Sequence, residues 1–432
     1  MKPRIVFFNR SYWPDSEATG QLLTRLSETL AADYEVEVVA GWPNHTQVDV
    51  TADQLKSPEK NGVRITRLRH TNFGKHSIAG RLCNLITFTL MAAWYGLRMR
   101  RPDVVIAQTD PFFLPLLGRV LKWWHKCRLI CYLQDIYPDI AIAVGKAREN
   151  WLTGLLRRWL FNAYRKADLV IVLGEDMFER CVQHGVPQSS LQIVENWADC
   201  QQVYPVKENN PFRLAQNMDD KFVVMYSGNL GLSHQLEPVI EAAAAFRDNS
   251  RILFLFVGEG AQKARLQQLV AEQELQNVRF LSYQPREKLA ESLSAADLQL
   301  VSILPEAVGC VMPSKIYGVL ASGTAMLTIC PSDCEIARMI EEEHLGTVCD
   351  GTEAETLAPQ LVQAIQMYLD QPELAATQGE RGRELCVARY DFPILAERFS
   401  GLMAQLTIKP TTDNSLANKP SASPLQKPTE VH

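Results

Sequence analysis

Short apolar runs alternate with longer amphipathic stretches along most of the chain. The runs are rich in β-branched residues and predict buried strands, whereas the stretches between them carry apolar residues three or four positions apart, as helices do. Segments of this kind build parallel sheets from strand–helix–strand units. Strands are expected over residues 4–9, 34–40, 63–69, 103–108, 128–133, 168–173, 192–194, 222–227, 252–257, 278–281, 298–303 and 325–329.

The alternation stops once and then restarts. Residues 196–220 are polar and poorly periodic and contain the turn sequence Glu-Asn-Asn-Pro, so they indicate a linker. A chain of 432 residues is also long enough for two domains of ordinary size. We therefore expect an α/β protein of two Rossmann-like domains, over residues 1–205 and 206–385, with parallel sheets facing across a cleft. Residues 409–432 are rich in Pro, Ser, Thr, Asn and Lys, which predicts a disordered tail.

The two halves of the chain differ in charge. Residues 1–205 contain 25 Lys and Arg against 20 Asp and Glu, whereas the remainder contains 19 against 29. The basic half also contains the most apolar helices, which favours an anionic, apolar partner over nucleic acid. The ten cysteines lack the spacing of zinc ligands and are expected to be reduced thiols. Because the first apolar run is too short for a signal peptide, we expect a cytoplasmic protein.

Three stretches of the basic half mix tryptophan with Arg and Lys. Residues 82–97 form an uncharged run between Arg81 and Arg98, shorter than the roughly 20 residues that span a bilayer. Residues 121–129 and 150–166 combine tryptophans with flanking cations, a composition typical of interfacial helices. Buried core helices with a basic exposed face would have the same composition. Three such stretches in one domain favour peripheral contact with an anionic membrane surface.

The segment over residues 302–327 contains the strongest candidate site. It follows an expected strand and combines Glu306, a glycine bend at Gly309 and the sequence Pro-Ser-Lys at the start of a helix. Ligands of open α/β sheets bind beyond the carboxyl ends of the strands, where a helix N-terminus offers free amides to an anion. Ser314 and Lys315 stand at this N-terminus, and the charge of Lys315 would add to the attraction. The expected ligand is a diphosphate.

Further loops follow other strands at the same expected edge. Their glycines would let the backbone approach a ligand closely, although glycine is also common in ordinary strand–helix loops. Gly20 begins a helix of the first domain, across the cleft from the loops of the second. The second-domain loops contain Gly228, Asn229 and Gly231, then Gly258 with Lys263 and Arg265, and then Tyr283.

Two carboxylates of the first domain follow the expected strand over residues 128–133. Asp135 and Asp139 could orient or deprotonate a sugar hydroxyl from the edge of the sheet, or they could cap the helix that follows. No Asp-x-Asp pair occurs in the chain, which argues against a nucleotide held by a metal.

Taken together, these motifs resemble those of the family 4 glycosyltransferases of the GT-B fold. The resemblance extends to about residue 406 and rests on WPDSEATG, YLQDIYPD, VENWAD, YSGNLG, FVGEG and VMPSKIYGVLASG, in this order. The chain is most similar to bacterial enzymes that build exopolysaccharide repeat units, of the colanic-acid type. The resemblance implies a retaining hexosyl transfer from a nucleoside-diphosphate sugar to a lipid-linked glycan, without a cofactor or an essential metal. It also implies that a helix over residues 386–408 crosses back to the first domain.

The chain departs from the family pattern at the donor site. Asn229 stands where the family has arginine, and Ser233 or His234 stands near its lysine. Cys310 and Gly318 occupy the places of its paired glutamates, so the missing charge would come from Lys315, Lys263 or Arg265. Catalytic roles are expected for Glu306, which would orient the donor sugar, for Lys315 and for Asp135. The expected donor-binding residues are Gly20, Gly228, Asn229, Gly231, Gly258, Lys263, Tyr283, Gly309, Ser314 and Lys315.

Two other functions fit the same residues. A nucleotide-sugar epimerase of the GT-B fold would use the donor site alone, although its soluble substrate would not account for the tryptophan-rich stretches. A catalytically silent partner that binds only donor or lipid fits the altered arginine, lysine and glutamate positions. Turnover without an acceptor would identify the first, and donor binding without turnover the second.

Overall fold

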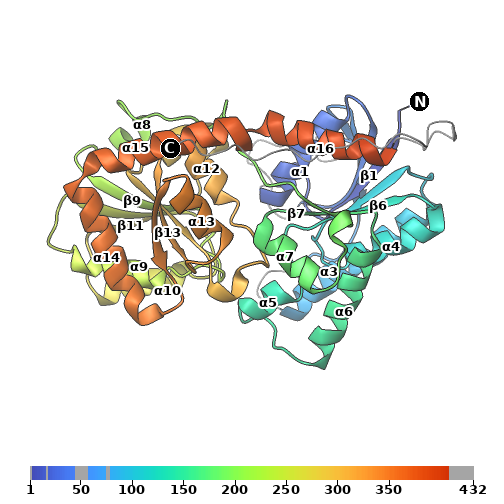
Figure 1. The fold of residues 1–432 in the computed structure, drawn as a ribbon, viewed down its shortest axis with the longest axis horizontal. Helices are drawn as coiled ribbons and strands as arrows, with labels where there is room; N and C mark the ends of the chain where they lie inside the picture. Colours follow the sequence, from blue (N-terminus) through green and yellow to red (C-terminus); the bar gives the residue numbers. More distant parts are fainter. Residues whose placement is uncertain (1, 16–17, 44–56, 74–77, 408–432) are drawn as a thin grey trace, which may run out of the picture.

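Two parallel sheets with helices on their faces organise the computed structural model, which describes residues 2–15, 18–43, 57–73 and 78–407 (Figure 1). The fold class predicted from the alternation of strands and helices is therefore confirmed. The tail predicted over residues 409–432 lies outside the described residues.

The first sheet has eight strands among the described residues, in the order β3-β4-β2-β1-β5-β6-β7-β8. Its strands are parallel except for β3, which pairs antiparallel with β4. The central strands are buried on both faces because helices cover the sheet on both sides, which explains their continuous apolar runs. The strands are β1 (Arg4–Phe8), β2 (Glu35–Gly41), β3 (Glu59–Lys60), β4 (Val63–Leu68), β5 (Val104–Ala107), β6 (Arg128–Tyr132), β7 (Leu169–Val172) and β8 (Leu191–Ile193). The helices are α1 (Ala18–Leu30), α3 (Ile78–Arg98), α4 (Leu114–His125), α5 (Asp139–Ala143), α6 (Trp151–Lys166) and α7 (Glu175–Gln183).

The second sheet is parallel throughout, in the order β11-β10-β9-β12-β13-β14. The order reverses next to β9, and such a switch point creates a crevice at the carboxyl ends of the strands. The strands are β9 (Phe222–Ser227), β10 (Ile252–Val257), β11 (Val278–Leu281), β12 (Leu298–Ser302), β13 (Ala325–Cys330) and β14 (Gly346–Asp350). The helices are α8 (Pro211–Ala215), α9 (Glu237–Ala245), α10 (Lys263–Glu272), α11 (Leu289–Ser294), α12 (Lys315–Ala321), α13 (Glu335–Glu342), α14 (Ala354–Asp370) and α15 (Pro372–Leu385).

Each strand expected from the sequence is present, but β3 and β14 were not expected. β3 consists of two polar residues, too few to form a pattern. β14 is an edge strand whose residues are mostly half-buried, so it lacks the apolar run of a central strand.

The chain crosses between the domains twice, and the two crossings are hydrogen-bonded to each other. In the linker, the Ala198 N–H donates to the Tyr390 carbonyl at 3.0 Å, and the Ala198 carbonyl accepts from the Phe392 N–H at 2.9 Å. The second crossing is a π-helical turn over Cys386–Tyr390 followed by α16 (Phe392–Thr407), which lies over the first domain in Figure 1, whereas α15 lies over the second. Phe399 and Met403 of α16 are fully buried in the core of the first domain. The crossover helix expected from the resemblance is therefore present.

An apolar surface lies on the outside of the first domain, where α4 packs between α3 and α6 (Figure 1). Five tryptophans expose more than half of their surface there, so the alternative that these side chains belong to the core is wrong. We call them the tryptophan face: Trp94, Trp123, Trp124, Trp151 and Trp159. None of the described helices combines the length and the apolar content that crossing a membrane requires.

Candidate functional site

The loops after β9 and β10 form one end of the site, and their glycines pack the two backbones together. Gly228 has φ +137° and Gly258 has φ +145°, which L side chains rarely adopt. A Cβ on Gly258 would overlap the Gly228 carbonyl oxygen, and a Cβ on Gly260 would overlap the backbone of Leu230. The contact between the two loops is therefore sufficient to explain these glycines. This agrees with the interpretation of the motif as ordinary strand–helix loops.

The backbone amides of the β9 loop are only partly available to a ligand. The N–H of Gly228 donates to Val257 O and that of Leu230 to Glu259 O, both at 2.9 Å. These two amides of the loop are therefore not available to a ligand. The N–H groups of Asn229 and Gly231 donate to no backbone carbonyl in the part of the chain that the structure describes.

Lys315 extends from the first residue of α12 toward this loop. Its Nζ lies 3.4 Å from the centroid of the Tyr226 ring and 3.7 Å from the place of a Cβ on Gly228. The nitrogen is buried and has no hydrogen-bond acceptor among the described residues, although the residue as a whole is half-buried. Burial lowers the pKa of Lys315 well below its ordinary value. A buried ammonium of this kind is costly unless an anion binds beside it.

His234 lies next to this ammonium. Its Nδ1–H donates to the Ser302 carbonyl at 2.5 Å, which fixes the tautomer. Burial, followed by the charge of Lys315, lowers the pKa of His234 to about 3, so the ring is neutral. Lys315 therefore brings its side-chain nitrogen close to the position where the family pattern has its lysine, and a bound anion would favour the charged form of this nitrogen.

The other two candidate cations are engaged elsewhere. Lys263 pairs with Glu259 at 2.7 Å and donates to the Gly258 carbonyl at 3.2 Å. Arg265 is half-exposed and pairs with Glu237 at 3.5 Å. Tyr283 lies beside Gly258 and is more than half exposed. The structure thus gathers Gly228, Asn229, Gly231, Gly258, Lys263, Tyr283 and Lys315 at the carboxyl ends of β9 and β10.

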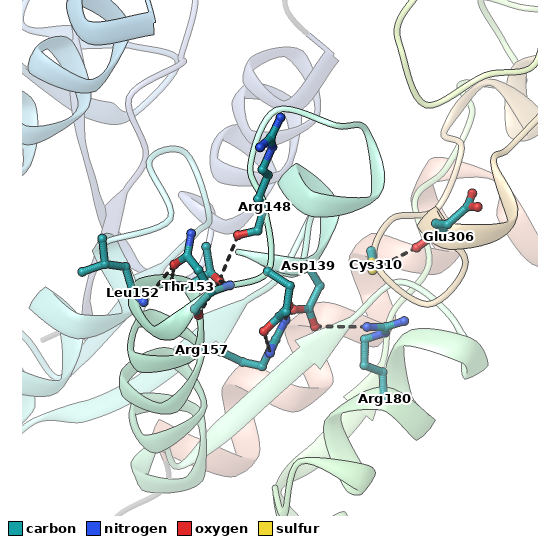
Figure 2. A network of polar contacts seen from close by, with 10 residues as sticks. Asp139, Arg148, Leu152, Thr153, Arg157, Arg180, Glu306 and Cys310 are labelled. Atoms are coloured by element: carbon teal, nitrogen blue, oxygen red, sulfur yellow. Dashed lines mark hydrogen bonds and ion pairs between the residues drawn. The ribbon is translucent and has the colours of Figure 1, made fainter.

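The remaining residues of the 302–327 segment point in different directions. Glu306 is exposed on a 3-10 turn over Pro305–Ala307, and Figure 2 shows its carboxylate turned away from the first domain. Ser314 is exposed and precedes α12 without capping it through its side chain. Gly309 has φ +71° and packs on α7, where a Cβ would lie 2.9 Å from the Asp176 carbonyl oxygen. Gly309 therefore contacts the first domain rather than the β9 loop.

Asp135 lies where the two domains meet. Its backbone forms a bridge with Val311 of the second domain, and the Ile136 N–H donates to the Cys310 carbonyl at 2.7 Å. Burial, followed by the nearby Asp110, raises the pKa of Asp135 to about 6. The capping alternative is wrong for Asp135, because α5 begins after Pro138 and has no side-chain cap.

Asp139 and Gly20 have structural surroundings. Asp139 is buried and accepts hydrogen bonds from Arg157 at 2.6 Å and from Arg180 at 3.0 Å (Figure 2). Gly20 lies in α1, and the nearest atoms to a Cβ at this position belong to Ser11 and Tyr12 of the same domain. Gly20 thus leaves room for the preceding loop.

Sequence reasoning missed the residues that act through the contact between the domains. Arg180 and Asp176 of α7, and Glu335 of α13, are charged residues in amphipathic helices and carry no motif. Tyr226 was also missed, although an aromatic residue directly before Ser-Gly at a strand end is a signal that could have drawn attention to it.

Two family models match the chain along most of its length. Residues 18–197 match the model described as "Glycosyl transferase 4-like domain", and residues 206–385 match "Glycosyl transferases group 1". The paired sheets, the crossover helix and these matches define a GT-B glycosyltransferase, and the chain belongs to family 4 of these enzymes.

Curated relatives and a solved structure agree with this family. The chain is similar to a probable glycosyltransferase, WbjE, of Pseudomonas aeruginosa, with 26% identity over 72% of this chain and 76% of that protein. It is similar to a putative colanic acid biosynthesis glycosyl transferase, WcaI, of Escherichia coli K12, with 26% identity over 82% of this chain and 93% of that protein. It shares the fold of HepE from Anabaena, solved with UDP and glucose, with a TM-score of 0.70, 15% identity and coverage of 93% and 100%.

Proposed function

We propose that this glycosyltransferase moves a sugar, with retention, from a nucleoside-diphosphate sugar to a lipid-linked glycan during exopolysaccharide synthesis. The observation that carries the proposal is the buried ammonium of Lys315, which has no acceptor among the described residues and lies beside the β9 loop. A diphosphate at this place would supply the missing acceptor. The similarity to WcaI and the UDP in the HepE structure support this ligand and this pathway.

The proposed mechanism depends on charge that develops during the reaction. Negative charge grows on the leaving diphosphate as the bond to the sugar breaks, and a cation in a buried place stabilises that charge more strongly than it would in water. Lys315 and the N–H groups of Asn229 and Gly231 would provide this stabilisation without a metal. Retention requires no enzyme nucleophile if the departing phosphate takes the proton of the acceptor hydroxyl on the same face of the sugar.

Two carboxylates would position the sugars. Glu306 would orient hydroxyls of the donor sugar. Asp135 would orient the acceptor hydroxyl from the first domain, so that its proton passes to the departing phosphate.

The tryptophan face supports a membrane-bound acceptor on the cytoplasmic side. Exposed tryptophans suit the boundary between lipid headgroups and acyl chains, and Arg98 and Lys126 at the ends of α3 and α4 suit anionic headgroups. Co-sedimentation with anionic vesicles should decrease when Trp123 and Trp124 are both replaced by Ser. Equal binding of the variant and the wild type would rule out this face as the contact.

The donor proposal is tested by transfer assays with a panel of nucleotide sugars. Lys315→Ala and Glu306→Gln should lose most of the transfer rate, whereas Lys221→Ala should retain it, because Lys221 precedes β9 at the opposite edge of the sheet and pairs with Asp220. Near-normal rates for both site variants would refute the assignment. Turnover of a nucleotide sugar without any acceptor would instead identify an epimerase, and binding without turnover would identify a silent partner.

A further inference from the structure

Helix α7 of the first domain connects the two domains through one of its faces. Asp176 and Arg180 are four residues apart and therefore lie one above the other on α7. The Asp176 carboxylate accepts the Glu335 N–H at 2.9 Å, and the Asp176 N–H donates to the Glu335 carboxylate at 3.4 Å. The N-termini of α7 and α13 thus cap each other across the domain boundary.

Arg180 reaches from the same face to the loop that carries the candidate donor residues. One guanidinium nitrogen donates to Asp139 at 3.0 Å, and the other donates to the Val308 carbonyl of the second domain at 3.3 Å. Its Nε lies 3.2 Å from the place of a Cβ on Gly309. Figure 2 shows Arg180 between Asp139 and the loop of Cys310.

The first domain holds this loop from two sides. α7 contacts Val308 and Gly309, while the loop that follows β6 contacts Cys310 and Val311 through the Ile136 N–H and the Asp135 bridge. The loop runs from Glu306 to Ser314, directly before Lys315. Its conformation therefore depends on contacts that exist only while the domains are together.

We propose that Arg180 is a positioning residue: it fixes the turn at Val308–Gly309 when the domains close, and thereby aligns Glu306 and Lys315 for transfer. Asp139 contributes by holding the guanidinium in place. The inference rests on the proposed donor function of the loop, but the contact that it describes exists independently of that function. The donor loop then takes its arrangement for transfer at the same time as the domains close.

Arg157 provides a matched control. It donates to the same Asp139 carboxylate at 2.6 Å, but its other partner is Glu149 of the first domain, at 2.7 Å. Arg157→Ala disturbs the same buried carboxylate and leaves the contact with Val308 in place. A purely structural role of the Asp139 cluster predicts equal consequences for the two arginines.

Hydrogen–deuterium exchange of the full chain tests the contact without requiring activity. Arg180→Ala should increase exchange in peptides over residues 304–314, and Arg157→Ala should leave them unchanged. Gly309→Ala should also increase exchange, because its added Cβ pushes the loop from α7 while Arg180 stays intact. Unchanged exchange in Arg180→Ala, or an equal increase in Arg157→Ala, would overturn the proposal. If Arg180→Ala does not fold, Arg180→Gln and Gly309→Ala carry the same test.

Steady-state kinetics connects the contact to transfer. Arg180→Ala should lower kcat at least about tenfold, the order expected when reacting groups are misplaced, and should change KM for the donor much less. A fall in thermal stability with unchanged kcat would show that Arg180 has a structural role only. If the wild type transfers no sugar from any donor while exchange changes as expected, the proposed function fails and the positioning contact stands.

Discussion

Replacing Lys315 by methionine should change stability and activity in opposite directions. Methionine has a similar length and no charge, and its sulfur can keep a contact with the Tyr226 ring. An unpartnered buried polar group costs about 1–3 kcal/mol, and the cation–π contact with Tyr226 offsets part of this cost. We therefore expect Lys315→Met to stabilise the free protein by about 1–2 kcal/mol. In a domain of this size, each kcal/mol corresponds to a rise in Tm of about 2–4 °C.

The same substitution should reduce transfer strongly. If Lys315 stabilises charge on the leaving diphosphate, its loss should lower kcat/KM by about 100- to 1,000-fold, as the loss of one transition-state contact typically does. Thermal unfolding and a transfer assay on the same preparation measure both effects. A variant that is both less stable and less active would indicate a structural lysine, and a variant of unchanged activity would refute the site.

Lys207 is a control for burial alone. It is a lysine of the second domain that is exposed as a residue, but its side-chain nitrogen is desolvated, which lowers its pKa to about 8. Unlike that of Lys315, this nitrogen has acceptors, at 3.2 Å from Thr324 Oγ1 and 3.5 Å from the carbonyls of Ser294 and Ala296. Lys207→Met leaves these acceptors unpaired and should destabilise the protein by about 1–3 kcal/mol. Opposite signs of the stability change at Lys207 and Lys315 would confirm that the missing acceptor is the relevant difference.

Three other substitutions test separate parts of the structure. Burial, followed by a neighbouring aspartate, raises the pKa of Glu335 to about 7 from 4.5, so the folded protein favours its protonated form and loses stability as the pH rises from about 4.5 through about 7. Glu335→Gln should therefore be more stable than the wild type by about 3 kcal/mol at pH 8 and should converge with it toward pH 4.5 in urea unfolding, and a difference independent of pH would contradict this. Gly258→Ala adds an overlap with the Gly228 carbonyl to an unfavourable φ, so its free energy of unfolding in urea should fall by about 2–4 kcal/mol. Gly145→Ala, at φ +70° but with open space around the added Cβ, should lose only about 1 kcal/mol. Equal losses in the two variants would show that the structure relieves the overlap. Asn150→Ala should cost about 1 kcal/mol because Asn150 caps two amides of α6, and Asn150→Asp should restore most of it; no loss would mean that water replaces the cap.

The strands and the fold class could be predicted because their signal is local. A run such as Ile252–Val257 is buried on both faces, so its apolar residues are continuous and bounded by polar turns. The position of Lys315 at a helix start after a buried strand was also visible in the sequence, because strand ends and helix starts are read from neighbouring residues. β14 was missed because an edge strand has no such run.

The rest of the site depends on contacts between distant segments. The role of Gly258 is explained by the carbonyl of Gly228, thirty residues earlier in the chain, and no local pattern distinguishes this packing from an approach to a ligand. Arg180 contacts Val308 only because the two domains dock as they do. Both contacts depend on the tertiary structure, and the sequence pattern of a single loop or helix does not reveal it.

The return of α16 to the first domain limits how this enzyme can be recombined with its relatives. Phe399 and Met403 complete the core of the first domain, although they follow the second domain in the chain. A chimera that exchanges everything after the linker would join a first domain to a foreign last helix and leave its core poorly filled. Functional exchanges of donor specificity should therefore have two junctions, one in the linker and one before Cys386, so that α16 stays with the domain whose core it fills.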